Sequence, residues 1–131
     1  LDICERTKLH LMMKKIYICS ALRGDYEKNS EKARCYSRYV AKEFGHIPIT
    51  PHIYFTEFMN DEIPEEREFG IQAGLFLLLS CDELWYFGDS VTKGMTTEIC
   101  TAIKNGIPIR YIEQKEYNNY LTERRIGYEM E

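Results

Sequence analysis

The second half of the chain contains the sequence CDELWYF at residues 81–87, followed by GMTTE at residues 94–98 and GIP at residues 106–108. The apolar run over 83–87 predicts a buried β-strand, which residue 82 introduces and a loop over 88–93 follows. Apolar residues then recur at helical spacing and stop before a glycine, which predicts a helix over 95–105. Residues 107–112 form a further apolar run. We therefore expect a strand, a helix and a second strand in this half of the chain.

The first half repeats this order. Residues 16–20 predict a first strand with a polar loop over 21–25, and helical spacing over 29–44 ends at a glycine. A short strand is expected at 47–50, where Pro51 stops it. The connection over 51–64 is aromatic-rich and longer than a plain connector, so we expect a lid or partner surface there. Acidic residues followed by apolar ones predict a helix over 65–80, and the polar, tyrosine-rich tail from Glu113 predicts a helix on the surface or on a second subunit.

Alternation of strands and helices predicts the α/β class. The expected architecture is a flavodoxin-like (Rossmann-like) three-layer sandwich with a parallel sheet of four to five strands. In such sheets ligands bind beyond the carboxyl ends of the strands, at the point where the strand order reverses. We therefore look for a site in the loops that follow the first and third strands.

Length and composition restrict the class of protein. The 131 residues suit one domain, which we place at 12–131, with 1–11 as a leader or vector-derived extension because Met12 and Met13 are natural starts. A net charge of −4 argues against general nucleic-acid binding, and no apolar run approaches the length of a membrane span. The five cysteines lack zinc-site spacing, so we expect reduced, mostly buried thiols and a cytoplasmic protein.

The quoted motifs resemble the second half of the nucleoside 2-deoxyribosyltransferase superfamily, which includes deoxynucleoside 5′-monophosphate N-glycosidases. The first half agrees, because Ile16-Tyr17 resembles the transferase start and SALRG at residues 20–24 is similar to the phosphate-binding loop of the glycosidases. The similarity extends from Lys15 to Ile112. A closer resemblance is to a branch of bacterial and phage domains of unassigned function. It rests on GHIP at 45–48, PH at 51–52, ERE-x-G at 66–70 and CDELW at 81–85.

The resemblance implies two catalytic residues. Glu98 matches the nucleophilic glutamate, whose carboxylate attacks the anomeric carbon and displaces the base. Tyr17 matches a tyrosine that orients this carboxylate. The alternatives are structural: Glu98 at the start of a helix stabilises the helix dipole by about 0.3–1 kcal/mol, and Tyr17 fills the face of a central strand.

The resemblance also implies substrate-binding residues. Ser20, Arg23 and Gly24 form a small polar loop at a strand end, where backbone N–H groups, a hydroxyl and a guanidinium can bind a phosphate. Thr92 stands where the glycosidases carry a phosphate-contacting serine. His52 is expected from its position, because it follows Pro51 at the end of the second strand, near enough to the cleft to contact a base or donate a proton. Asp89 and Gly94 are the other expected binding residues. The alternatives remain an ordinary Arg-Gly turn, a loop histidine after a proline, a structural cap at Asp82, and strand-core roles for Trp85 and Tyr86.

One departure from the superfamily pattern concerns the leaving base. The superfamily has an aspartate that assists at the base eight residues before the position of Asp82, and here that position is Gly74. Loss of general acid help typically slows such chemistry by about 100- to 10,000-fold. Asp89, Glu68 or His52 are the candidates to replace the aspartate.

Three functions therefore stay open. The first is an N-glycosidase or deoxyribosyltransferase, the second a non-catalytic nucleotide sensor or sequestering module, and the third a protein-interaction module that uses residues 51–64 and the tail. The expected partners are a small-molecule nucleoside or nucleotide and further copies of the chain, with no metal and no organic cofactor. We expect a homodimer or larger assembly, with Tyr54, Phe55, Tyr117 and Tyr120 as exposed aromatic residues.

Overall fold

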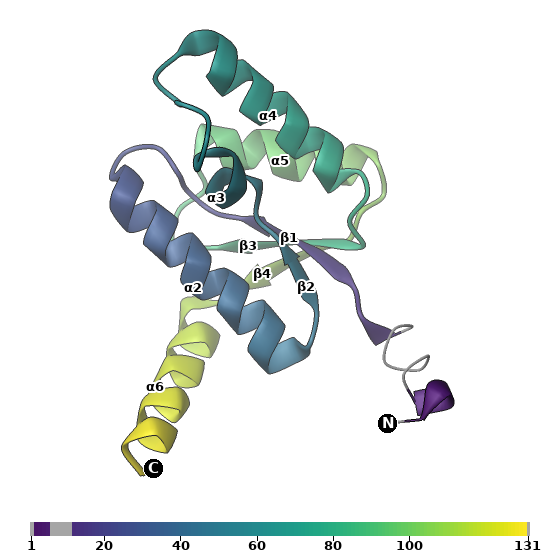
Figure 1. Cartoon of the computed structure of the whole chain (residues 1–131), viewed down its shortest axis with the longest axis vertical. Coiled ribbons are helices and arrows are strands. Elements are labelled where there is room, and N and C mark those ends of the chain that lie inside the picture. Colours follow the sequence, from purple (N-terminus) through teal and green to yellow (C-terminus); the bar gives the residue numbers. More distant parts are fainter. Residues whose placement is uncertain (1, 6–11, 131) are drawn as a thin grey trace.

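The computed structural model describes residues 2–5 and 12–130, with side chains described up to residue 123 (Figure 1). Residues 1, 6–11 and 131 lie outside the described residues. Most of the expected leader over 1–11 therefore falls outside the described part, and its assignment stays a prediction.

The described chain forms a four-stranded sheet with the order β2–β1–β3–β4, in which every neighbouring pair is parallel. The strands are β1 (Lys15–Cys19), β2 (Ile47–Ile49), β3 (Glu83–Phe87) and β4 (Ile109–Ile112). Because β2 and β3 lie on opposite sides of β1, the strand order reverses at β1. The predicted α/β fold with a parallel sheet is confirmed.

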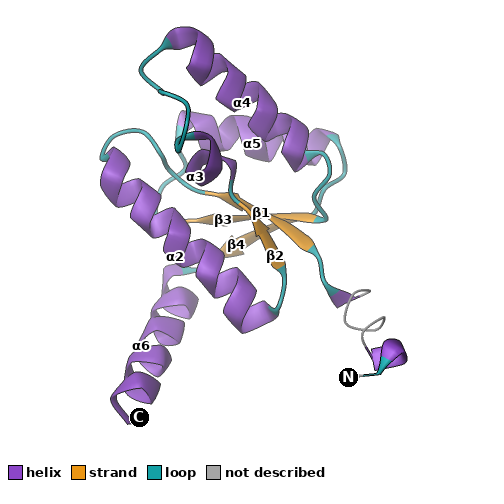
Figure 2. Cartoon of the chain, in the orientation of Figure 1, coloured by secondary structure: helices purple, strands orange, loops and turns teal. Residues whose placement is uncertain are grey.

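Helices cover both faces of this sheet, as Figure 2 shows. On one face lie α2 (Tyr26–Phe44) and α6 (Gln114–Met130), and on the other lie α4 (Pro64–Leu78) and α5 (Lys93–Lys104). Short helix α3 (Pro51–Phe55) packs beside α4. The predicted helix boundaries are correct to within three residues.

Alternation along β1 divides the core in two. Ile16 and Ile18 face α2 and α6, where they join a cluster rich in aromatic residues that includes Trp85. Tyr17 and Cys19 face α4 and α5, where they join a second cluster. Successive side chains of a strand point to opposite faces, so one central strand contributes to both cores.

The prediction that Tyr117 and Tyr120 are exposed is wrong. Tyr117 and Tyr120 are each only 7% exposed, because α6 packs them against Tyr39 of α2. The connection over 51–64 is not all loop, because it begins with α3. Within α3, Tyr54 is exposed as predicted and Phe55 is half-buried.

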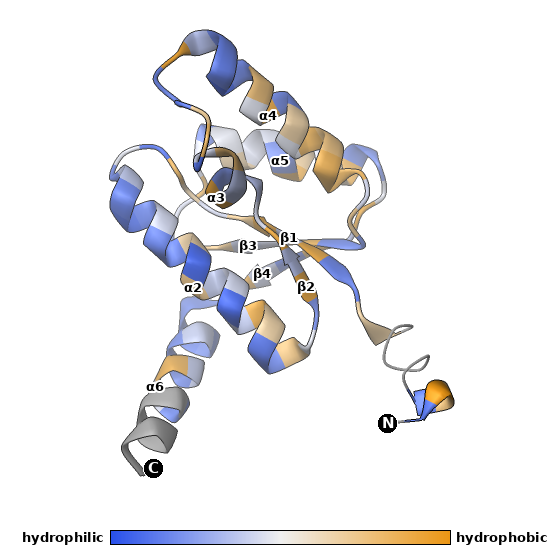
Figure 3. Cartoon of the chain, in the orientation of Figure 1, coloured by the Kyte–Doolittle hydropathy of each residue, from blue (hydrophilic) through white to orange (hydrophobic). Residues whose placement is uncertain are grey.

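Helix α4 also has apolar residues on its exposed side. Figure 3 shows that the carboxyl-terminal half of this helix is largely apolar, and Phe76 is 75% exposed. None of the described helices is both long and apolar enough to cross a membrane.

Asp82 links the start of β3 to the start of β1. Its carboxylate Oδ2 accepts a hydrogen bond from the backbone N–H of Lys15 at 2.8 Å, and its own N–H donates to the Lys15 carbonyl at 2.9 Å. This arrangement matches the structural alternative for Asp82.

We expect Asp82→Ala to lower the free energy of unfolding by about 1 kcal/mol, because the Lys15 N–H loses its acceptor. Asp82→Asn, which keeps an acceptor oxygen, should lose less. Urea denaturation of both variants measures the difference. Equal stability of the alanine variant and the wild type would contradict a structural role.

Candidate active site

Tyr17 and Glu98 meet on the α4–α5 face of the sheet. Tyr17 lies in the middle of β1 and is 3% exposed, and Glu98 lies in the second turn of α5. The Tyr17 hydroxyl donates a hydrogen bond to the Glu98 carboxylate. The structure thus brings together the two residues that the sequence proposed as catalytic.

Cys19 is a third member of this cluster, and sequence reasoning missed it. Its fully buried thiol donates to Glu98 Oε1 and to the Met95 carbonyl, with Sγ 3.9 Å from each oxygen. Cys19 lies two residues after Tyr17 in the same strand, so both side chains point to the same face. That spacing was the available signal.

Burial controls the charge of the Glu98 carboxyl. Removal from water raises its pKa from 4.5 to about 7, and the hydrogen bonds from Tyr17 and Cys19 only partly oppose this increase. Burial also raises the pKa of Tyr17 and of Cys19, so both remain protonated donors. Near neutral pH, Glu98 can therefore act either as a nucleophilic carboxylate or as a proton donor.

Position 74 lies directly beside this cluster. A Cβ atom added to Gly74 would be 3.4 Å from the Tyr17 hydroxyl oxygen and 3.7 Å from Cβ of Pro51. These are ordinary van der Waals distances. The departure from the superfamily pattern is thus located at the candidate site.

Ser20 and His52 form a second polar pair at the same edge of the sheet. Ser20 follows β1 and His52 is the second residue of α3, and Ser20 Oγ lies 3.3 Å from His52 Nε2. Ser20 is 8% exposed. Burial lowers the pKa of His52 to about 4, so its imidazole is neutral at pH 7.

Arg23 and Gly24 occupy a well-defined turn. The Asn29 side-chain amide donates to the carbonyls of Leu22 and Arg23, and Gly24 adopts a φ of 104°, which favours glycine. The Arg23 side chain is 59% exposed and forms an ion pair with Asp61, at 3.5 Å. Its described charge partner is therefore in the α3–α4 connection and not in the Glu98 cluster.

The remaining predicted residues lie around the start of α5 without joining the cluster. The Thr92 hydroxyl accepts a hydrogen bond from the Met95 N–H and caps the helix, and Gly94 is exposed in the first turn. Asp89 is exposed. Burial raises the pKa of Tyr36, a residue of the opposite core, and the charge of Asp89 adds to this increase. Within the residues described, no group of three or more His, Cys, Asp or Glu side chains could hold a metal ion.

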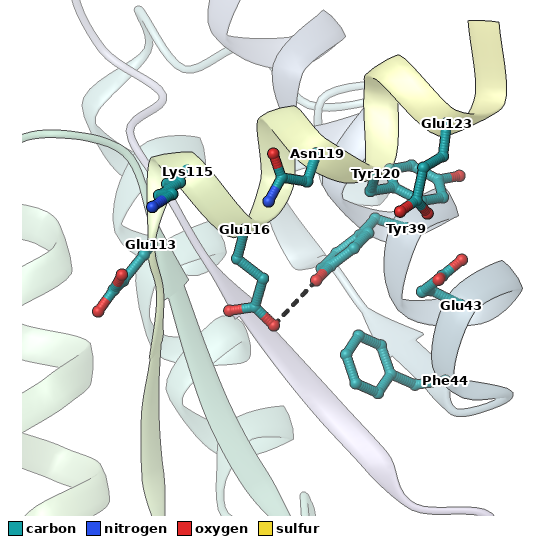
Figure 4. Close-up of a pocket in the computed structure, with 9 residues that line it drawn as sticks. All are labelled: Tyr39, Glu43, Phe44, Glu113, Lys115, Glu116, Asn119, Tyr120 and Glu123. Atoms are coloured by element: carbon teal, nitrogen blue, oxygen red, sulfur yellow. Dashed lines mark hydrogen bonds between the residues drawn. The ribbon is translucent and has the colours of Figure 1, made fainter. Parts of the chain in front are cut away.

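A cavity of about 520 Å³ lies on the other face of the sheet, between α2 and α6 (Figure 4). Its Glu116 carboxylate already accepts hydrogen bonds from Tyr39 and Arg110. The guanidinium of Arg110 also stacks over the rings of Phe44 and Trp85. Because these polar groups hold α6 against the sheet, we place the candidate site at Glu98 and not in this cavity.

Residues 14–112 match the family model described as Domain of unknown function (DUF7768). The chain belongs to this family. No curated protein matches the DUF7768 chain. Among solved structures, its fold is similar to a 2-deoxyribosyltransferase from the psychrotolerant bacterium Bacillus psychrosaccharolyticus. The TM-score is 0.57 and the identity 22%, over 74% of this chain and 70% of that chain.

At this identity the comparison shows a shared fold. That enzyme is described as a suitable biocatalyst for the industrial synthesis of antiviral and antitumoral nucleosides. The expected deoxyribosyltransferase-like fold of the DUF7768 chain is confirmed, and the expected bacterial and phage branch stays a prediction.

The Glu98 pKa predicts a pH-dependent stability of the DUF7768 chain. The folded state holds a proton on Glu98 up to about pH 7, while the unfolded state releases it near 4.5, so the stabilisation is complete below pH 4.5 and is lost between these values. Glu98→Gln does not titrate. It should therefore gain about 2–3 kcal/mol relative to the wild type between pH 4 and pH 8.

Denaturation at both pH values measures this gain. Thr97→Ala, an exposed neighbour on α5 without a titratable group, is the control and should differ from the wild type equally at both values. A constant difference between Glu98→Gln and the wild type would show that Glu98 titrates in the same way in both states.

Proposed function

We propose that the chain binds a nucleoside or nucleotide beyond the carboxyl ends of β1 and β3 and cleaves or transfers its N-glycosidic bond through Glu98. One observation carries this proposal: a partly buried carboxyl in the second turn of α5 accepts hydrogen bonds from Tyr17 and Cys19 of the central strand. It lies at the strand end where ligands bind in open parallel sheets. The shared fold with a 2-deoxyribosyltransferase supports the same substrate class.

The proposed reaction has two steps. The Glu98 carboxylate attacks the anomeric carbon of a 2-deoxyribosyl group, and the electron pair of the carbon–nitrogen bond leaves with the base, which takes a proton from solvent. Water or the nitrogen of a second base then attacks the same carbon, loses a proton and restores the carboxylate. Tyr17 and Cys19 hold the carboxylate in position through their hydrogen bonds.

The first test is release of free base from the four common 2′-deoxynucleosides and their 5′-monophosphates, followed by chromatography. We expect Glu98→Ala to abolish release, with a loss of at least about 1,000-fold, because the nucleophile is removed. Activity should rise with pH through about 7 as Glu98 ionises. Unchanged release by Glu98→Ala would exclude the proposed nucleophile.

A second function is favoured by Gly74. With glycine in place of the superfamily aspartate at position 74, the site lacks a second carboxyl beside the leaving base and can bind a nucleotide without cutting it, as a sensor or a sequestering module. This function predicts no release of base by the wild type and thermal stabilisation by nucleotides that persists in Glu98→Ala.

Gly74→Asp distinguishes the two functions. An added Cβ fits at ordinary contact distance, so the new carboxyl would lie beside the Tyr17 hydroxyl. In a binding protein that lacks only this group, we expect base release to appear, and in an active enzyme we expect it to increase by about 10- to 100-fold. Gly70→Asp, one turn earlier on α4 where an added Cβ meets nothing within 4 Å, is the matched control. An equal effect of both variants would exclude a site-specific role for position 74.

The proposal also includes a homodimer or larger assembly. Exposed apolar side chains on α3, α4 and the segment between them support it, including Tyr54, Phe58 and Phe76, which are 63%, 57% and 75% exposed. Burying such side chains against a second copy would stabilise the assembly.

A further inference from the structure

In the described part of the chain, one ring nitrogen of His52 contacts a neighbouring side chain, and the other does not. Nε2 lies 3.3 Å from the Ser20 hydroxyl oxygen, whereas Nδ1 has no hydrogen-bond partner among the described residues. Ser20 is buried, so this contact fixes the ring at the end of β1. The imidazole is therefore oriented by one nitrogen and available to a ligand through the other.

The position of His52 connects it to the Glu98 cluster by two routes. Ser20 directly follows Cys19, whose thiol contacts the Glu98 carboxylate. On the other side, Pro51 lies next to the Cβ position of Gly74, which in turn lies beside the Tyr17 hydroxyl. The parallel pairing of Tyr17 with Ile49 explains this geometry, because Ser20 and His52 each lie three residues beyond a paired position.

The other candidates to replace the missing aspartate are placed differently. Asp89 is exposed, and its charge acts on Tyr36 of the opposite core. Glu68 is exposed on α4 and accepts a hydrogen bond from the Gln72 side chain. Of the three, only His52 is held by a buried partner beside the site.

We propose that His52, held by Ser20, binds the nucleobase through Nδ1 and so determines which bases the site accepts. This inference rests on the proposed function, because it assumes a nucleoside in the Glu98 site. It makes His52 a specificity-determining residue and not the acid that protonates the base.

The chemistry of the ring suits this role. Burial lowers its pKa to about 4, so a neutral imidazole offers one N–H and one lone pair. If the Ser20 hydroxyl donates to Nε2, then Nδ1–H donates to the ligand; in the other tautomer Nδ1 accepts. A neutral ring recognises the polar edge of an uncharged base, and it provides no positive charge to attract a phosphate.

Two substitutions separate the two ring nitrogens, and both are made in the Glu98→Ala background so that binding is measured without cleavage. His52→Gln can keep the contact with Ser20 and lose the Nδ1 contact, whereas His52→Asn can keep a polar atom near Nδ1 and lose the contact with Ser20. Calorimetry with the four common 2′-deoxynucleosides measures the affinity, and 2-deoxyribose 5-phosphate is the base-free control ligand.

We expect His52→Gln to weaken the best-bound nucleoside by about tenfold and His52→Asn to weaken it less, with no change for the base-free ligand. Unchanged nucleoside affinity in His52→Gln, or an equal loss for the base-free ligand, would overturn the inference. If His52→Gln does not fold, Ser20→Ala provides the second test. It should weaken nucleoside binding and spare the base-free ligand, and the opposite pattern would overturn the inference.

The same measurements distinguish failure of the proposed function from failure of the role of His52. If the Glu98→Ala protein with His52 intact binds none of the nucleosides, the proposed function fails and this inference fails with it. If that protein binds a nucleoside and His52→Gln binds it equally well, only the role of His52 fails.

Discussion

The carboxyl group of Glu98 is the constraint on which the candidate site depends. A carboxylate that leaves water must be given donors, and here the donors come from one strand, two residues apart. Period-two alternation places Tyr17 and Cys19 on the same face of β1, and the Thr92 cap fixes the start of the helix that carries Glu98. Strand register and helix start together determine the geometry of this cluster.

The fold could be predicted because its signals are local. Short apolar runs gave the strands, and the glycines at 45 and 106 marked the ends of helices. A helix was predicted for the tail, but its many polar residues obscured the helical spacing that buries Tyr117 and Tyr120 of α6 against α2. Helix α3 was not predicted because it has only five residues, begins at a proline and carries little periodic pattern.

The site was only partly predictable for a different reason. A resemblance to a known superfamily identified Glu98 and Tyr17, but no local pattern links Ser20 to His52, which are 32 residues apart. Their contact results from topology, since the carboxyl ends of neighbouring parallel strands lie at the same edge of the sheet. The Arg23–Asp61 ion pair was equally invisible in the sequence, because it joins two loops.

The titrations of Glu98 and His52 have opposite effects on the pH dependence of stability. On folding, Glu98 takes up a proton that the unfolded chain would release above pH 4.5, and His52 gives up one that the unfolded chain would hold below 6.5. Between about pH 4.5 and 6.5 both exchanges occur, so the proton that Glu98 takes up on folding offsets the proton that His52 gives up. Acidification from about pH 6.5 to 4.5 would therefore leave the stability contributed by this pair nearly unchanged, although each group on its own would make the fold sensitive to pH.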